Sequence, residues 1–284
     1  MKIEKLGFTD WLKDQDFEGI LFDIDGTIVV GNNPMTGAKE LLDYLRSSQT
    51  GFKFLTNDGS HSPEEKADIM AEGHVIVDKD EIITCSSVIA DYAKKHNLIN
   101  NKVFIFGDLG IPNYAELAGL EVETDILKLE NCSGIIISEG EYNWLENITA
   151  AVNFYMHNPN RYLIIPNPDS YWPAEKKGYI GIGSGGIARF ITTILDEAKV
   201  HIKPIYLGKP YSGIFDYAIE KLENETGTLN RNKIIMLGDS VRSDILGANN
   251  AQLQSGLILS GITDLHHLED LEEEFHPNYI FNHL

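Results

Sequence analysis

Residues 20 to 27 of this 284-residue chain read Ile20-Leu21-Phe22-Asp23-Ile24-Asp25-Gly26-Thr27. An apolar run that ends in acidic residues and a glycine is typical of a strand that leads into a turn. Two carboxylates at i and i+2 can act as a nucleophile and an acid/base partner, and the glycine allows a turn that exposes backbone amides to an anion. Taken alone, an ordinary strand-ending turn is the stronger interpretation. A calcium loop does not fit, because its twelfth position is Pro34 and not Glu.

Outward from this stretch, short apolar runs alternate with helical patterns. The runs span residues 52–55, 103–106, 134–137, 162–165, 234–237 and 256–259. Apolar residues recur at helical spacing over 38–45 and 215–222, and Ser62 to Glu65 has the pattern of a capped helix start. This alternation predicts an α/β fold, with a mostly parallel, Rossmann-like sheet covered by helices.

The composition excludes several classes of protein. Lys and Arg number 23 against 43 Asp and Glu, which gives a formal net charge of −20 and argues against binding of a nucleic acid polymer. The two cysteines, Cys85 and Cys132, cannot form a disulfide framework or a four-cysteine zinc site, and they favour a reducing compartment. No apolar run is long enough for a membrane span. We therefore expect a cytoplasmic protein without membrane contacts.

Three more polar segments follow apolar runs, where the strands of an open α/β sheet place ligands. Thr56 and Asn57 follow the run at 52–55, Lys209 precedes a predicted helix, and Asp239 and Asp244 follow the run at 234–237. Hydroxyl, amide and ammonium groups suit phosphate, and carboxylates suit a hard cation such as Mg²⁺. Each segment by itself is a common turn or surface feature.

The order and spacing of the four segments carry more information than any one of them. They run as Asp-x-Asp-Gly-Thr, strand-Thr-Asn, Lys-Pro and Gly-Asp-x-x-x-x-Asp, at residues 23–27, 56–57, 209–210 and 238–244. This pattern resembles the haloacid-dehalogenase-like hydrolase superfamily. The resemblance implies a phosphohydrolase with a Rossmann-like core and an aspartyl-phosphate intermediate.

The resemblance also assigns roles to residues. Asp23 matches the nucleophile, and Asp25 matches the acid/base residue that protonates the leaving group and activates water. Thr56, with Asn57 beside it, matches the group that binds phosphoryl oxygens. Lys209 matches the cation that bridges nucleophile and phosphate.

A magnesium ion is implied in the same way. Asp239 matches a direct Mg²⁺ ligand, joined by the Asp23 side chain and the Asp25 backbone carbonyl. Asp244 matches the outer carboxylate that steadies water on the metal. Such an ion would reverse the local negative charge, so a chain of net charge −20 can still bind a small phosphate ester.

About 150 residues separate Asn57 from Lys209, more than one crossover needs, so an inserted domain is expected. Residues 82–90, 103–107 and 167–185 resemble the large α/β cap of the NagD-like and p-nitrophenylphosphatase-like subfamily. We place the core at 1–80 and 203–284 and the cap at 81–202. The resemblance offers Asn167 and Asp169 as cap contacts to the substrate, although a plain Asn-Pro-Asp turn explains them equally well. Relatives oligomerise through the cap, which leaves a homo-oligomer open.

Some features depart from the pattern or compete with it. Asp58 stands where the family usually has Asn, which adds negative charge to the phosphate loop, and Gln252 replaces a usual Gly. A Gly-x-Gly-x-x-Gly at 181–186 has no long strand before it and no acid about 20 residues later, so we expect a turn and not a dinucleotide site.

These observations predict a Mg²⁺-dependent phosphomonoesterase that acts on small phosphorylated metabolites, of the nucleotide or sugar phosphate class. A phosphotransferase or phosphomutase could use the same groups. A non-catalytic metabolite-binding protein of the same fold is a further alternative, but every motif residue is present.

Overall fold

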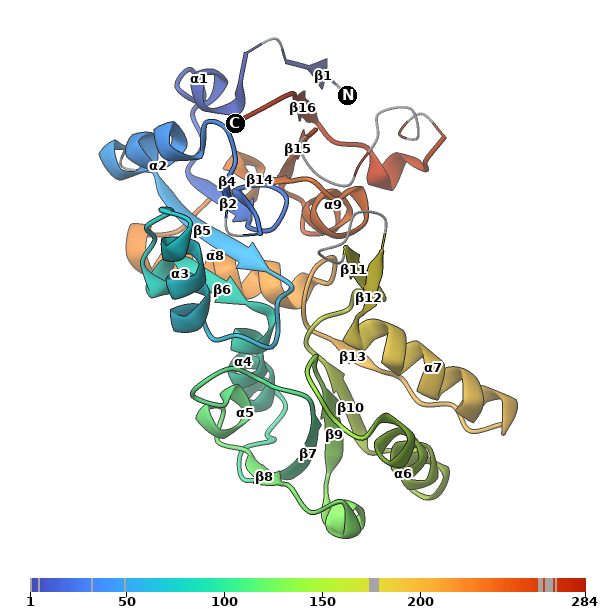
Figure 1. Ribbon diagram of the computed structural model, residues 1–284. Helices are drawn as coiled ribbons and strands as arrows, with labels where there is room; N and C mark the ends of the chain where they lie inside the picture. The colour runs from blue at the N-terminus through green and yellow to red at the C-terminus, as the bar shows by residue number, and fades with distance from the viewer. Residues whose placement is uncertain are drawn as a thin grey trace. The chain divides into compact units, whose positions relative to one another are not determined.

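The computed structural model describes residues 2–4, 6–31, 33–48, 50–173, 179–259, 263, 268 and 270–284. The chain forms two compact units. The core unit comprises residues 1–56, 66–83 and 209–284, and the inserted unit comprises residues 57–65 and 84–208. Both have strands alternating with helices, so the predicted α/β fold is confirmed (Figure 1). The predicted domain boundaries, at 80/81 and 202/203, stay a prediction.

The main sheet of the core unit has the strand order β1-β16-β15-β14-β2-β5-β6 among the described residues. The strands are β1 (Lys2–Ile3), β2 (Gly19–Asp23), β5 (Gly51–Thr56), β6 (Ile82–Thr84), β14 (Ile234–Gly238), β15 (Gln254–Ile258) and β16 (Tyr279–Phe281). All pairings from β1 across to β5 are parallel. β2 and β14 are buried along their whole length, as expected for strands covered on both faces.

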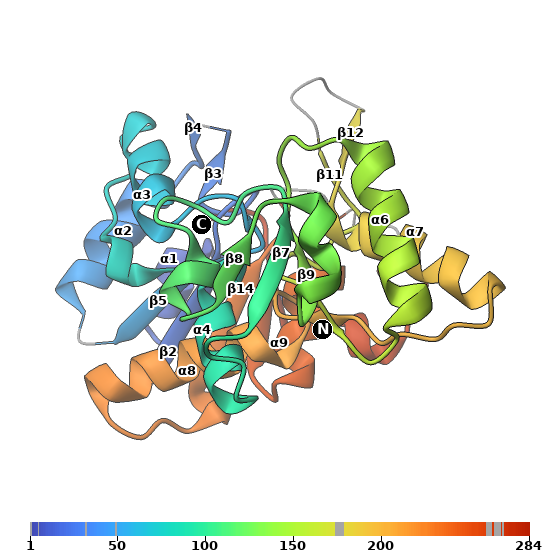
Figure 2. The same ribbon diagram turned by 90° about the horizontal axis from the view of Figure 1, so that it is seen from below.

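Helices cover both faces of this sheet, and in Figure 2 it lies between α2 and α3 on one side and α8 on the other. The helices are α1 (Phe8–Leu12), α2 (Ala38–Ser47), α3 (Pro63–Glu72), α8 (Ser212–Thr226) and α9 (Leu246–Asn250). A short hairpin pairs β3 (Val29–Val30) with β4 (Asn33–Pro34). The predicted capped start of α3 is present, because the Glu65 amide donates to Ser62 Oγ while the Ser62 amide donates to Glu65 Oε2.

The register of the central strands brings the polar segments to one edge of the sheet. Asp23 at the end of β2 pairs with Leu55 of β5, and Leu237 of β14 pairs with Phe22 of β2. Parallel strands place their carboxyl ends on the same side. Asp23, Thr56 and the segment after β14 therefore meet at that side.

The inserted unit has its own parallel sheet, ordered β13-β10-β9-β7-β8 among the described residues. Its strands are β7 (Lys102–Phe106), β8 (Glu121–Glu123), β9 (Gly134–Ile137), β10 (Tyr162–Ile165) and β13 (Ile205–Tyr206). Its helices are α4 (Val88–Lys95), α5 (Tyr114–Leu117), α6 (Trp144–His157) and α7 (Ser184–Glu197). A separate antiparallel hairpin joins β11 (Tyr171–Pro173) to β12 (Ile180–Ile182).

The core of the inserted unit lies between this sheet and the pair α6 and α7, which pack side by side (Figures 1 and 2). Phe154 of α6 and Ile191 of α7 are fully buried against strand residues such as Phe106 and Ile135. This packing, and not the weak propensity of either helix alone, is what holds them on the sheet.

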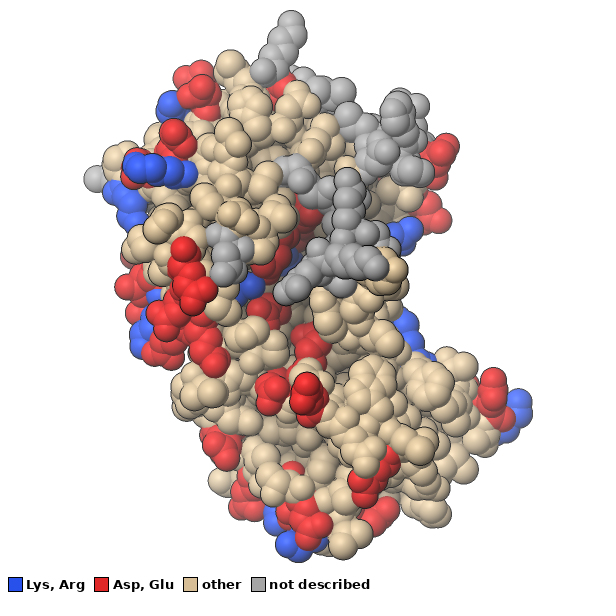
Figure 3. Space-filling model, viewed as in Figure 1, with Lys and Arg blue, Asp and Glu red and all other residues tan. Residues whose placement is uncertain are grey.

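The surface agrees with the composition. Acidic side chains are more prominent than basic ones on the face shown in Figure 3. No helix among the described residues has the length and apolar character needed to cross a bilayer.

The core of the inserted unit provides a test with a matched control. Phe154→Ala is expected to lower the free energy of unfolding by about 3–5 kcal/mol, because it leaves a cavity among buried side chains. Phe190→Ala on α7 removes the same ring from a position that is 55% exposed and should change it by less than about 0.5 kcal/mol. Urea unfolding followed by circular dichroism measures both, and equal losses would contradict this packing.

Candidate active site

The buried ammonium of Lys209 organises the edge of the core sheet. The side chain is only 2% exposed. Its Nζ donates to Asp23 Oδ1, to Asp244 Oδ1 at 2.7 Å and to the Leu55 carbonyl at 3.3 Å. Burial alone would lower the pKa of Lys209, but the two carboxylates outweigh it and hold that pKa above its ordinary value. Lys209 is therefore charged and fixed.

Three buried carboxylates lie close together at this edge of the sheet, and two of them contact the ammonium. Asp23, Asp239 and Asp244 each place one oxygen within 4.8 Å of the oxygens of the other two. Burial, more than any neighbouring charge, raises the pKa of Asp23 well above its ordinary value, and Asp244, Asp239 and Asp25 raise it further against the opposing effect of Lys209. The cluster holds three acids against one ammonium, so a second positive charge would favour the ionised form of all three. The cluster therefore suits a divalent cation.

Asp244 is held by the turn that follows β14. A π-helical turn, Val241–Ile245, carries it back toward the strand, and Asp244 Oδ2 accepts the Ser240 amide at 3.1 Å. A Cβ at Gly238 would lie 2.2 Å from the Asp244 carboxyl, so this position accepts no side chain. Both Asp244 oxygens thus accept protein hydrogen bonds, one from Lys209 and one from the backbone.

The turn after β2 brings Asp239 close to Asp23. Gly26 has φ +91° and its amide donates to the Val29 carbonyl at 2.7 Å, which closes the turn. A Cβ at Gly26 would lie 2.4 Å from Asp239 Oδ2. Gly26 is thus required both by its positive φ and by the approach of Asp239.

Asp25 lies on the same turn but is more exposed, with about half of its side-chain surface accessible. Thr56 Oγ1 donates to Asp25 Oδ2 at 3.3 Å. Lys66 Nζ donates to both Asp25 oxygens, at 3.1 and 2.9 Å. Sequence reasoning missed Lys66, although a lysine one turn before the buried Met70 on α3 stands out on an apolar helix face.

The remaining predicted residues lie in the inserted unit and form one chain of hydrogen bonds. Asn57 Nδ2 donates to Asp169 Oδ2 at 2.9 Å, and the Asp169 amide donates to Asn167 Oδ1 at 2.8 Å. Asn167 Nδ2 donates to Glu139 Oε1 at 2.6 Å. The structure therefore brings Asn57, Asn167 and Asp169 together. The hydrogen bond from the Asp169 amide to Asn167 Oδ1 also closes the Asn-Pro-Asp turn.

Glu139 is a second residue that sequence reasoning missed. Burial, followed by repulsion from Asp58, raises the pKa of Glu139 to about 7 against the hydrogen bond from Asn167. Its position two residues after the apolar run 134–137 is close to the signal that marked Asp23, which directly follows its own run. The unusual Asp58 is part of its own turn, where it accepts from Ser60 Oγ at 3.0 Å and lies 2.9 Å from His61 Nδ1.

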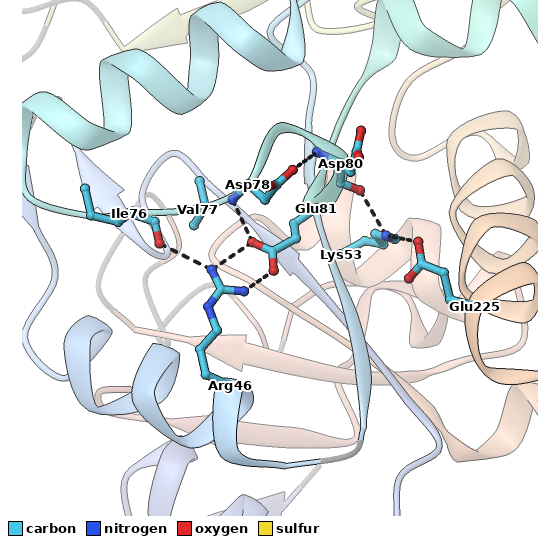
Figure 4. A pocket seen from close by; sticks show the side chains of 8 residues that line it. All are labelled: Arg46, Lys53, Ile76, Val77, Asp78, Asp80, Glu81 and Glu225. Carbon is cyan, nitrogen blue, oxygen red and sulfur yellow. Dashed lines mark hydrogen bonds and ion pairs between the residues drawn. The ribbon is translucent and has the colours of Figure 1, made fainter.

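A cavity of about 520 Å³ in the core unit contains none of the predicted residues (Figure 4). Four of its charged side chains form two ion pairs. Arg46 Nη2 donates to Glu81 Oε2 at 2.9 Å, and Lys53 Nζ donates to Glu225 Oε1 at 2.6 Å. Asp78 Oδ1 accepts the Asp80 amide at 2.9 Å, and we assign the cavity no role in chemistry (Figure 4).

Two family models match the chain. One, described as haloacid dehalogenase-like hydrolase, covers residues 20–121, and the other, described as HAD-hydrolase-like, covers residues 206–284. The first includes Asp23, Asp25 and Thr56, and the second includes Lys209 and Asp239. The candidate site residues at both ends of the core sequence thus fall inside the matched ranges.

Individual proteins match over nearly the full length. An acid sugar phosphatase of Staphylococcus haemolyticus is 26% identical over 270 residues, which cover 95% of each chain. NagD of E. coli K-12 superposes with a TM-score of 0.78 at 25% identity, over 95% of this chain and 97% of its own. A glycerol phosphate phosphatase of Mycobacterium tuberculosis, in complex with magnesium, has a TM-score of 0.78 at 21% identity and covers 94% and 75%. The chain belongs to the haloacid dehalogenase-like hydrolases and is a phosphatase of their NagD-like subfamily.

Proposed function

We propose that the protein is a Mg²⁺-dependent phosphomonoesterase that forms an aspartyl-phosphate on Asp23. The observation that carries this proposal is the buried cluster in which Lys209 fixes Asp23 and Asp244 beside Asp239. The cluster presents a carboxylate nucleophile, a fixed cation and an excess of negative charge in one place. Phosphoryl transfer needs mainly this combination of positioning and charge neutralisation.

The donor set of the cluster fits magnesium. Mg²⁺ prefers carboxylate, carbonyl and water oxygens, and the excess of three acids over one ammonium favours its entry. The side chains of Asp239 and Asp23 and the backbone carbonyl of Asp25 would hold it, while Asp244, whose oxygens accept from Lys209 and Ser240, supports them from outside. When bound, the ion neutralises charge on the phosphoryl oxygens.

In the first step, an Asp23 oxygen attacks phosphorus and forms an acyl phosphate while the bond from phosphorus to the ester oxygen breaks. The Lys209 ammonium donates a hydrogen bond to Asp23 Oδ1 and so fixes the carboxylate while the other oxygen attacks. Its positive charge also balances charge on the phosphoryl group. Asp25, held by Thr56 and Lys66, gives its proton to the departing oxygen. We assign Thr56 and Asn57 to the phosphoryl oxygens as well.

In the second step, Asp25 removes a proton from water, whose oxygen attacks phosphorus. The bond from phosphorus to Asp23 breaks, so inorganic phosphate leaves and the carboxylate is restored. The Asp25 side chain is exposed enough to reach water, whereas Asp23 is buried. This difference in exposure supports separate roles for the two acids.

Several observations support small phosphorylated metabolites, of the nucleotide or sugar phosphate class, as substrates. The similarity to an acid sugar phosphatase supports the small size, and the net charge of −20 argues against polymeric nucleic acid. Asn167 and Asp169 are our candidates for substrate contacts in the inserted unit. Two free, buried cysteines support a reducing, cytoplasmic compartment. A homo-oligomer formed through the cap stays a prediction.

The roles of the two acids predict different losses. Asp23→Asn should abolish turnover because the amide is not a nucleophile, whereas Asp25→Asn should lower kcat by about 10²–10⁴-fold. Asp43→Asn makes the same change on the exposed face of α2 and should leave kcat unchanged. The measurement is release of inorganic phosphate and of p-nitrophenol from p-nitrophenyl phosphate without an added acceptor. Full activity of Asp23→Asn refutes the mechanism. Release of p-nitrophenol that requires an added acceptor, with the phosphoryl group on the acceptor and no inorganic phosphate, indicates a phosphotransferase.

Removal of the metal should stop the reaction. Dialysis against EDTA is expected to abolish phosphate release, and Mg²⁺ should restore it. Added Mg²⁺ should also raise the melting temperature of the wild type, because it relieves repulsion among the three carboxylates. Asp244→Asn should need about 10–100-fold more Mg²⁺, and Asp239→Asn more still. Undiminished activity after metal removal, with no response of the melting temperature, contradicts the metal site.

Lys66 provides a test of how Asp25 is positioned. Lys66→Met removes the ammonium that holds both Asp25 oxygens, and should lower kcat for an alkyl phosphate by about 10–10²-fold. Turnover of p-nitrophenyl phosphate should change much less, because that leaving group needs little help from an acid. Lys66→Arg should recover part of the loss. An equal loss on both substrates indicates a merely structural role for Lys66.

A further inference from the structure

The polar segment after β5 takes its position from the inserted unit. The chain passes from the core unit to the inserted unit between Thr56 and Asn57. The Cys85 thiol donates to the Asn57 carbonyl at 3.2 Å. Ser86 Oγ donates to the Gly59 carbonyl at 2.6 Å, and both donors are fully buried. Asn57, which we assign to the phosphoryl oxygens, is therefore held by contacts within the inserted unit.

A carboxylate orients the Asn57 carboxamide. Asn57 Nδ2 donates to Asp169 Oδ2 at 2.9 Å. A carboxylate accepts from the nitrogen of a carboxamide and not from its oxygen, so it selects one of the two orientations of the Asn57 side chain. Asp169 is itself fixed, because its amide donates to Asn167 Oδ1 at 2.8 Å. The direction of the Asn57 side chain thus depends on the Asn-Pro-Asp turn.

The start of α7 holds this turn by its backbone. A Cβ at Gly183 would lie 2.2 Å from the Asp169 carbonyl oxygen. A Cβ at Gly185 would lie 1.9 Å from the Pro168 carbonyl oxygen. Arg189 Nη1 donates to the same Pro168 carbonyl at 3.0 Å. The Gly-x-Gly-x-x-Gly segment, which contains both glycines, thus lets the backbone of α7 approach the turn closely.

Glu139 connects the turn to the sheet of the inserted unit. Its Oε1 accepts from Asn167 Nδ2 at 2.6 Å and lies 3.5 Å from the amide of Ser184, the first residue of α7. Its own carbonyl accepts the Asp108 amide at 2.7 Å, in the segment after β7. A charged acceptor makes a stronger hydrogen bond than a neutral one, and a helix N-terminus favours a negative charge. The ionised form of Glu139 therefore holds Asn167 more firmly than the neutral form.

The surroundings of Glu139 decide when it is ionised. Burial and repulsion by Asp58 and Asp169 raise its pKa to about 7, against the hydrogen bond from Asn167. Asp58 is itself paired with His61 at 2.9 Å. The titratable groups around Glu139, taken over the segments packed against it, are those of Asp58, Cys85, Asp108, Tyr142 and Asp169. Glu139 thus changes between its two forms near neutral pH.

We propose that Glu139 is a positioning residue for phosphate binding, which in its ionised form fixes the turn at Asn167 and thereby sets the direction of the Asn57 carboxamide. The inference rests on the proposed function, because it needs the assignment of Asn57 to the phosphoryl oxygens. Every hydrogen bond in the path lies within the inserted unit. Asn57 reaches the core unit through its peptide bond to Thr56.

The test uses Glu139→Gln, which keeps an acceptor oxygen and resembles the neutral form at every pH. At about pH 8 its KM for p-nitrophenyl phosphate should be about 5–10-fold above that of the wild type, because a neutral acceptor replaces a charged one. At about pH 6 the two KM values should agree within about twofold, because Glu139 of the wild type is then largely neutral. Titration of the substrate is common to both proteins and cancels from the ratio, and kcat should change less than KM.

Two further variants separate this role from folding. Glu141→Gln makes the same change at an exposed position two residues away and should leave KM unchanged at both pH values. In an Asn57→Ala background, Glu139→Gln should raise KM no further, since the side chain that it positions is missing. The inference is overturned by a KM ratio that is equal at both pH values, by a ratio below one at about pH 8, or by a full additional rise in the Asn57→Ala background.

Failure of the proposed function gives a different result. In that case even the wild type releases no phosphate from an ester. Isothermal titration with inorganic phosphate in the presence of Mg²⁺ then measures Kd in place of KM. A Kd ratio of Glu139→Gln to wild type that rises between about pH 6 and about pH 8 supports the inference. A constant ratio, or no binding of phosphate, overturns it.

Discussion

The site depends on one buried ammonium group. Lys209 lies between Asp23 and Asp244 and out of contact with water, so it holds two carboxylates that would otherwise repel each other. Burial of charges is costly unless each is paired and hydrogen-bonded. One lysine stands against three acids, and this excess is the reason why we propose that the cluster holds a cation and is not a closed ion pair. With that cation bound, the same sheet edge would attract a phosphate ester in a chain of strongly negative charge.

Much of this site could be predicted from local sequence. Each apolar run ends within one residue of the end of its strand, and β9 and β10 have the bounds of their runs, because buried parallel strands are continuous in sequence. β15 begins two residues before its run, since a polar Gln254 still pairs with β14. The sequence marks the positions of Lys66 and Glu139 but not their partners, because their contacts depend on packing between distant segments.

The two units divide the work by chemistry. The core unit supplies groups that suit any phosphate monoester: a carboxylate, an acid, a lysine and oxygen ligands for a metal. The inserted unit supplies Asn167 and Asp169, our candidates for substrate contacts, which are held by hydrogen bonds to each other and to Glu139.

The central claim is that Asp23 becomes phosphorylated, and direct trapping tests it best. Wild-type protein with Mg²⁺ is mixed with p-nitrophenyl phosphate, quenched with acid within milliseconds, digested and analysed by mass spectrometry. The account predicts a phosphate group on the peptide that contains Asp23, labile to hydroxylamine and absent from Asp23→Asn. Phosphate release with no modified peptide at any quench time, or with the group on another residue, would contradict the account.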